Sequence, residues 1–87
     1  MIVVYSKDAK KNLDTLDPSV AKRLIKKVKE LTDQSDPLSF AKPLTANFSG
    51  FHRFRVGDYR IIFSVEKDGS VTILTILRIA HRKDIYK

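Results

Sequence analysis

The spacing of apolar residues changes once along the chain, from a helical period to the alternation that is typical of β-strands. A short β-type run at residues 2–5 comes first. Apolar residues then recur every three or four positions, which predicts one helix ending at about residue 16 and a second over about 18–34. Ser6 and Asp17 are suitable N-caps for these helices. Two adjacent helices of this kind predict a helix hairpin.

From residue 51 onward, apolar and polar residues alternate with the period of two that strands have. Three strands are expected, at about 51–56, 59–65 and 71–80. Gly57-Asp58 and residues 67–69 are typical of tight hairpin turns, so these strands should pair antiparallel. Residues 35–50 contain two prolines and scattered apolar residues, and are expected to form a long, partly packed connection.

These elements predict an α+β fold, with the N-terminal helix hairpin packed on one face of a small, mainly antiparallel four-stranded sheet. Residues 1–87 are enough for a single domain with one core. Successive side chains in a strand point to opposite faces, so the helices should cover the face that collects most apolar residues. That face is expected to carry Phe54, Val56, Tyr59, Ile61, Phe63, Val65, Val71, Ile73, Leu77 and Ile79.

The opposite face of the predicted sheet collects positive charge. Its arginines are Arg53, Arg55, Arg60, Arg78 and Arg82, and Ile62, Leu74 and Ile76 are expected beside them. We call the surface carrying these five arginines the arginine face. An ordinary solvated face would mix threonine, lysine, glutamate and serine, whereas here no carboxylate offsets the cluster. Because the guanidinium fork matches phosphate oxygens, the pattern favours a phosphate-binding site.

Composition agrees with a polyanionic partner. Seventeen Lys and Arg residues against ten Asp and Glu residues give a net charge of +7, which favours nucleic acid or an acidic protein as partner. Five cations follow the polar side of the second predicted helix, and either a solvated face or phosphate contacts would explain them. They are Lys22, Arg23, Lys26, Lys27 and Lys29.

The same composition bears on location. The chain has no cysteine, no apolar run long enough to cross a membrane and no apolar stretch of a secretory signal near its start. A cytoplasmic protein without a membrane partner is therefore expected.

The closing segment AHRKDIYK adds residue types that suit phosphodiester cleavage. His81 can move a proton near neutral pH, Arg82 can stabilise a pentavalent phosphate, and Tyr86 can stack on a base. No metal-site motif and no Gly-rich phosphate loop is present, so neither a metal nor another cofactor is expected. A metal-independent nuclease needs the 2′-OH of its substrate as nucleophile, and this points to RNA.

These residues carry a family resemblance that covers essentially the whole chain. The series of strand, helix hairpin, SGFHRFRVGDYRIIFSV, a D-G hairpin and ILRIAHRKDIY resembles the RelE toxins of the RelE/ParE superfamily, the toxin half of type II toxin–antitoxin systems. The phrases RVGDYRIIF and HRKDIY favour the RelE branch. The resemblance implies a fold similar to the microbial ribonucleases. It also implies cleavage of mRNA in the ribosomal A site, leaving a 2′,3′-cyclic phosphate and a 5′-OH.

The resemblance also implies roles for residues. Arg60 matches the family's catalytic-face arginine, Arg82 the arginine of the closing motif, and Tyr86 the terminal tyrosine that orients or stacks on the substrate. Arg53 and Arg55 stand where RelE has two lysines, one of them a proposed general base. The cations expected to bind RNA phosphates are Arg53, Arg55, Arg78 and Lys83.

Arginine is a poor general base, so proton transfer needs another explanation. Either a histidine is the base, with His81 the first candidate, or the rate rests on phosphate stabilisation and geometry. His52 alternates toward the helices and is expected to be a packed or edge histidine.

The partners implied are an acidic, RelB-like antitoxin, the ribosome and mRNA. Two other functions remain open: a ParE-like inhibitor of DNA gyrase that acts by binding, and a non-catalytic module of the same fold that binds RNA or a protein.

Overall fold

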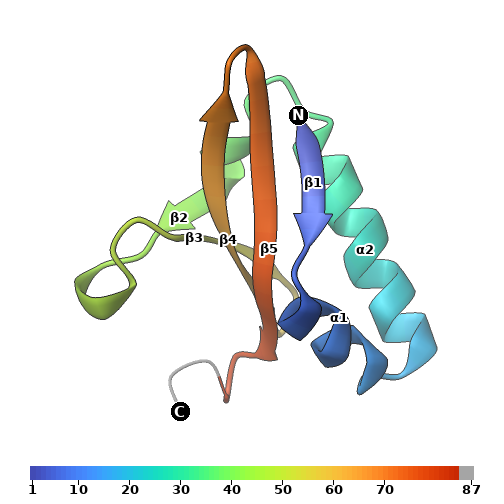
Figure 1. The fold of residues 1–87 in the computed structure, drawn as a ribbon. Helices are drawn as coiled ribbons and strands as arrows, with labels where there is room; N and C mark the ends of the chain where they lie inside the picture. The colour runs from blue at the N-terminus through green and yellow to red at the C-terminus, as the bar shows by residue number, and fades with distance from the viewer. Residues whose placement is uncertain (85–87) are drawn as a thin grey trace.

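The computed structural model describes residues 1–84 and places two helices on one side of a five-stranded sheet (Figure 1). The helices are α1 (Lys7–Asp14) and α2 (Pro18–Thr32), and the strands are β1 (Ile2–Tyr5), β2 (Ala41–Pro43), β3 (His52–Val56), β4 (Tyr59–Asp68) and β5 (Val71–His81). Two short 3-10 helices, η1 (Pro37–Phe40) and η2 (Ala46–Phe48), flank β2. The predicted α+β fold with a helix hairpin is confirmed.

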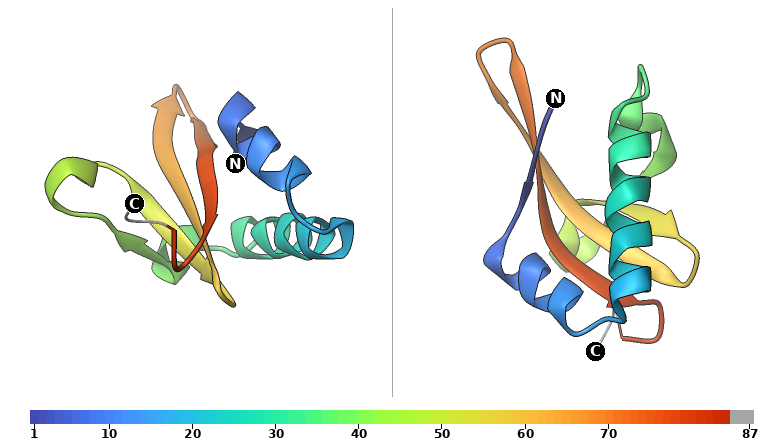
Figure 2. Two further views of the ribbon diagram at one scale, coloured as in Figure 1. Left: turned by 90° about the horizontal axis from the view of Figure 1, so that it is seen from below. Right: turned by 90° about the vertical axis from the view of Figure 1, so that its right-hand side faces the viewer.

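Both helices begin where their capping residues were expected. The Ser6 hydroxyl accepts a hydrogen bond from the Ala9 amide at 3.0 Å, and the Asp17 carboxylate accepts one from the Ser19 amide at 2.9 Å. Each bond satisfies a first-turn N–H group that has no partner inside the helix. The apolar stripe of α2 buries Leu24 and Val28 against the sheet. Figure 2 shows α1 and α2 together on one side of the twisted strands.

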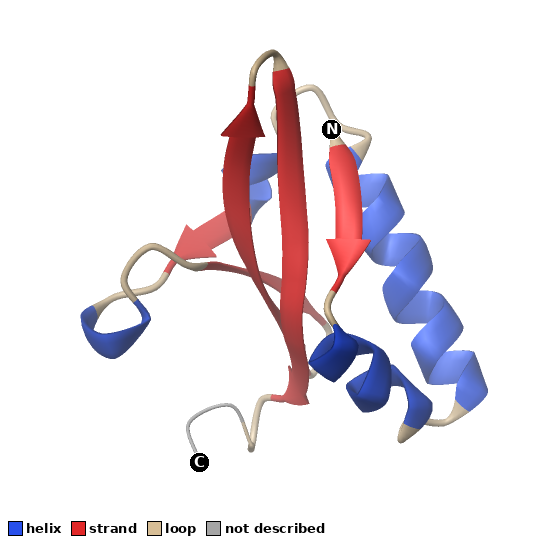
Figure 3. Ribbon diagram, in the orientation of Figure 1, coloured by secondary structure: helices blue, strands red, loops and turns tan. Residues whose placement is uncertain are grey.

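The sheet has the strand order β1-β5-β4-β3-β2. Strand β1 pairs parallel with β5, and the other neighbours pair antiparallel. The edge strand β2 corrects the predicted number of four strands to five. Its residues lie in the segment expected to be a connection, because three residues ending in a proline show no alternation that sequence can detect. Figure 3 shows this short strand between the two 3-10 helices.

A β-bulge in β5 reverses part of the predicted side-chain pattern. Ile62 pairs with Arg78 but Phe63 pairs with Ile76, so Leu77 has no partner across the ladder and the alternation changes phase there. Leu74 and Ile76 are therefore fully buried in the core, and their expected position on the arginine face was wrong. The expected core positions of Val71, Ile73 and Leu77 were also wrong, and Val71 is 40 % exposed.

Helix α1 holds the bulge in place. The Ser6 amide donates to the Ile76 carbonyl at 2.8 Å, and the Ser6 hydroxyl donates to the Leu77 carbonyl at 3.1 Å. The Asn12 side-chain oxygen accepts from the Ile79 amide at 3.0 Å. These bonds satisfy polar groups of β5 beyond the point where its pairing with β1 ends.

The core lies between the helices and the sheet. Its largest fully buried side chains come from β3, β4, β5 and α2, and they are Phe54, Phe63, Leu24, Ile61, Leu74, Ile76 and Val28. The Phe54 and Phe63 rings lie 4.4 Å apart between centroids. Within residues 1–84, neither helix has the length and apolar character that a membrane crossing needs.

Candidate functional site

The strand register brings four of the predicted arginines to one face of the sheet. Arg55 pairs directly with Arg60, and Arg53 and Arg78 pair with Ile62 from opposite sides. Directly paired residues project to the same face, so Arg53, Arg55, Arg60 and Arg78 lie together on the side that the helices leave uncovered. Ile62 is 7 % exposed and lies among them as an apolar residue of this face. The bulge leaves the predicted grouping of these arginines unchanged.

Arg60 is the buried member of the cluster, with 8 % of its surface exposed. Its Nη1 donates to the Gly57 carbonyl at 3.3 Å and to the Tyr59 carbonyl at 3.2 Å, so the turn between β3 and β4 fixes the guanidinium. Burial lowers the pKa of Arg60, and the charges of Arg55, Arg53 and Arg82 lower it further, while Asp58 raises it. A partly desolvated cation surrounded by like charges gains free energy when a phosphate binds beside it.

Arg82 lies in the turn after β5, beside the turn between β3 and β4. Its amide donates to the Asp58 carbonyl at 2.7 Å, and its Nε lies 3.6 Å from Asp58 Oδ1. Both side chains are more than half exposed, so this ion pair adds little to stability. The pair holds Arg82 near enough to Arg60 for its charge to lower the Arg60 pKa.

The other predicted phosphate-binding residues lie at the end of β5. Arg78 Nη2 donates to the Asp84 carbonyl at 3.2 Å, which ties the arginine face to the turn that follows the strand. Lys83 is exposed in that turn, and its amide donates to His81 Nδ1 at 3.2 Å. Tyr86, the predicted substrate-orienting residue, lies outside the described residues.

His81 is the last residue of β5, and its strand pairing gives it the same face as Tyr59. His81 pairs with Tyr59, which packs against the core, and the two rings meet edge to face at 5.4 Å between centroids. His81 and Arg78 nevertheless line one pocket of about 470 Å³ at the end of β5, so the expected role of His81 at the edge of the arginine face stays a prediction. Strand β5 runs one residue further than predicted, so His81 still follows the strand alternation. His52 stacks on Phe63 at 5.6 Å, and its predicted packed position is confirmed.

Sequence reasoning missed the contribution of β2 to the site. Lys42 pairs with Arg53 and so adds a cation on the same side of the sheet. Lys42, Arg53 and Phe48 also line a small groove of about 160 Å³, in which the Phe48 ring is 40 % exposed. An exposed aromatic ring beside cations suits the stacking of an unpaired base. Only recognition of β2 as a strand would have revealed this part of the site.

The arrangement can bind phosphate groups and stabilise negative charge that develops on them. Within the part of the chain that the structure describes, no three histidine or acidic side chains gather as a metal site needs. The cations converge from the four strands β2–β5 and from the turn after β5, which suits a bent or single-stranded nucleic acid better than one small anion.

Comparison with known proteins identifies the family of this chain. The model of the ParE toxin of type II toxin–antitoxin systems, parDE, matches residues 3–86. The chain belongs to this ParE toxin family. This ParE-family toxin is 34 % identical to Toxin RelG of Mycobacterium tuberculosis, over 98 % of this chain and 94 % of that protein. The expected membership of the RelE/ParE superfamily is confirmed, and the protein is a toxin of a type II toxin–antitoxin system.

Solved structures agree with this fold. The ParE-family toxin is similar to a chain of the toxin–antitoxin complex RelBE2 from Mycobacterium tuberculosis, with a TM-score of 0.79 and 28 % identity over 93 % of this chain and 96 % of that one. It is also similar to a chain of the archaeal RelE–RelB complex from Pyrococcus horikoshii OT3, with a TM-score of 0.67 and 25 % identity over 95 % and 96 % of the two chains. The first of these relatives was solved as a toxin–antitoxin complex and the second as a RelE–RelB complex.

Proposed function

We propose that this toxin is an endoribonuclease that cuts mRNA in the ribosomal A site. The observation that carries the proposal is the convergence of Arg53, Arg55 and Arg78 around the buried Arg60 on one uncovered face. Guanidinium groups fixed in this way can stabilise the charge of a pentavalent phosphate. The substrate 2′-OH would attack the adjacent phosphorus without a metal, and the 5′-oxygen would leave. The products are a 2′,3′-cyclic phosphate and a 5′-OH.

The residues take different roles in this reaction. Arg60 and Arg82 stabilise the phosphate that reacts, because the turn between β3 and β4 contacts both of them. Arg53, Arg55, Arg78 and Lys83 bind the flanking phosphates. Tyr86 orients or stacks on the substrate, as the family resemblance implies.

The surroundings of His81 bear on which group accepts the proton of the 2′-OH. Its ring meets the Tyr59 ring edge to face, and its Nδ1 accepts a hydrogen bond from the Lys83 amide. These two contacts already engage the imidazole, which supports the explanation in which the rate rests on phosphate stabilisation and geometry.

His81→Ala should therefore leave every inflection of the pH–rate profile where it is in the wild type. The measurement is single-turnover cleavage between about pH 5 and 9, a range that spans the ordinary pKa of histidine. Loss of an inflection in the His81→Ala profile would instead identify this residue as the proton carrier. His52→Ala, in which the other packed histidine is changed, is the matched control.

The partner proposed for this toxin is an acidic, RelB-like antitoxin that neutralises it in the cytoplasm. Its negative charge would complement the net charge of +7, and its binding would cover the arginine face or bar entry to the A site.

Primer extension on a translated message tests the proposed function. Expression of the toxin should give stops within reading frames, only while translation proceeds, and fragments that end in cyclic phosphate. Co-expression of the acidic protein encoded beside it should remove the stops.

A ParE-like inhibitor of DNA gyrase is the second candidate, favoured by the family model that matches the chain. Trapped gyrase–DNA complexes without RNA stops would establish this candidate in place of the nuclease. Absence of both would leave a non-catalytic binding module.

A further inference from the structure

A second basic surface lies between α2 and the turn that joins β3 to β4. A groove of about 550 Å³ lies between them, and both basic and acidic residues line it. Arg23, Lys26, Lys27 and Glu30 line it from α2, and Val56, Gly57 and Asp58 line it from β3 and the turn. We call this surface the α2 groove.

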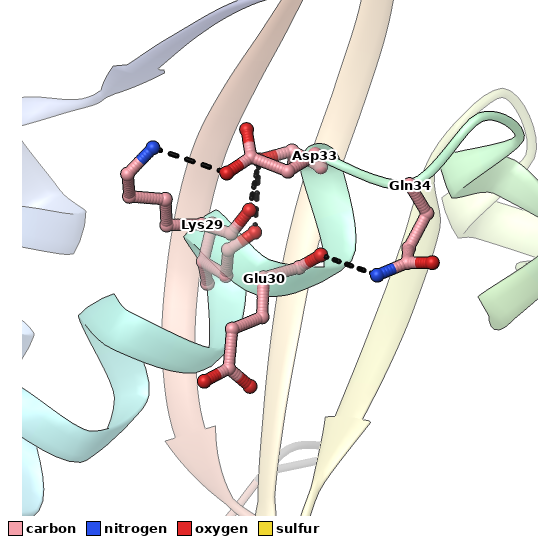
Figure 4. Close-up of polar contacts among 6 residues, drawn as sticks. Lys29, Glu30, Asp33 and Gln34 are labelled. Carbon is pink, nitrogen blue, oxygen red and sulfur yellow. Dashed lines mark hydrogen bonds and ion pairs between the residues drawn. The ribbon is translucent and has the colours of Figure 1, made fainter.

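Ion pairs leave the α2 groove with a positive surplus. Lys27 lies 3.7 Å from Glu30, and Asp58 lies 3.6 Å from Arg82. Further along the helix, Lys29 lies 3.1 Å from Asp33 (Figure 4). Among residues 1–84, Arg23 and Lys26 have no ion pair, and both are exposed. The two acidic residues of the groove are thus occupied, while two of its cations are available to an anion.

The turn between β3 and β4 joins the α2 groove to the arginine face. Gly57 and Asp58 line the groove, whereas the Gly57 carbonyl accepts a hydrogen bond from Arg60, and Arg82 contacts Asp58. Gly57 has a φ of +59° and only open space where a Cβ would stand, so this position of the turn leaves room for a strand that crosses it. Arg82 pairs with Asp58 on this turn, and its charge reaches Arg60, so Arg82 connects the arginine face with the cations of α2.

We propose that the RNA strand held by the arginine face continues over the Gly57–Asp58 turn into the α2 groove, where Arg23 and Lys26 bind its phosphates. The inference rests on the proposed function and extends it, because it assigns a second binding segment to the same substrate. Continuity of charge with the arginine face favours the substrate strand over a separate anion. A groove that tracks the RNA backbone in this way reads no sequence.

The test measures RNA binding without cleavage. Fluorescence anisotropy follows the full chain with 2′-O-methyl RNA of about 4 and about 12 nucleotides, lengths that bracket a short and a long single-strand site. The 2′-O-methyl group prevents attack by the 2′-oxygen. The variant is Arg23→Gln with Lys26→Gln, and the matched control is Lys7→Gln with Lys10→Gln, which removes the same charge from α1.

The wild type and the α1 control should bind the long RNA more tightly than the short one. The α2 variant should bind both RNAs with similar affinity, so the gain in affinity with length should be lost. For single-stranded RNA, each phosphate contact contributes about −0.7 to the slope of log K against log salt concentration. The α2 variant lacks two such contacts, so its slope with the long RNA should be shallower than that of the wild type by about 1.4. Between about 50 and 200 mM salt, the wild type should then lose about sevenfold more affinity than the variant.

Other outcomes separate the inference from the proposed function. An equal gain with length in the wild type and the α2 variant would overturn the inference and leave the arginine face as the RNA site. An equal gain combined with weaker binding of the acidic antitoxin by the variant would assign the groove to that protein and overturn the inference as well. Failure of the wild type to bind either RNA would overturn the inference, whereas the proposed function fails only if primer extension on a translated message shows no stops.

Discussion

Arg60→Ala should lower the single-turnover rate of RNA cleavage about 100-fold or more, because the variant lacks a fixed cation where negative charge develops. The buried position of Arg60 and its hydrogen bonds to the Gly57 and Tyr59 carbonyls hold the guanidinium in place before the substrate arrives. Arg82→Ala should lower the rate by a similar factor, since Arg82 lies against the same turn. Rapid mixing of excess toxin with ribosomes that carry labelled mRNA measures the rate of the cleavage step.

Two controls separate chemistry from folding. Arg60→Lys keeps the charge but loses the fork that binds phosphate oxygens at two points, so its rate should fall between those of the wild type and Arg60→Ala. Lys67→Ala removes an exposed charge near the end of β4 and should keep the wild-type rate. Thermal unfolding and antitoxin binding show whether each variant folds. Cleavage at the wild-type rate in both folded alanine variants would exclude the assigned roles of Arg60 and Arg82.

Ile76→Ala should lower the free energy of unfolding by about 2–5 kcal/mol, whereas Ile73→Ala should lower it by roughly 1 kcal/mol or less. The bulge at Leu77 turns the fully buried Ile76 into the core and leaves Ile73 on the other face. Both variants remove the same atoms from the same strand, so each is the control for the other. Urea unfolding with linear extrapolation measures both values. A larger loss in Ile73→Ala would mean that the strand keeps an unbroken alternation.

The helices and four of the five strands could be predicted because each depends on local chemistry. Ser6 and Asp17 cap helices from their own first turns, and the Gly57-Asp58 turn needs only its two residues and the strands beside it. The bulge depends instead on the bonds of Ser6 to Ile76 and Leu77, which join the two ends of the chain. The local sequence of β5 does not predict these bonds. The burial of Leu74 and Ile76 in the core could therefore not be predicted from the alternation of β5.

The candidate site was predictable to the same extent. Arg53, Arg55 and Arg60 lie on two strands joined by a short turn, so their common face follows from alternation alone. Lys42 escaped detection because β2 is short and ends in a proline. The pairing of His81 with Tyr59 was not predicted, because the predicted strand ended at residue 80, one residue before the end of β5.

The parallel pairing of β1 with β5 has a consequence for the order in which the protein folds. Ser6 and Leu77 are 71 residues apart in sequence, so closing this contact costs chain entropy that no local structure repays beforehand. During synthesis, β1 has no strand to join until residues 73–76 have left the ribosome. Arg78 belongs to the same late strand. A nascent chain can thus form its helix hairpin early, but the full set of cations on the arginine face assembles only after β5 has left the ribosome.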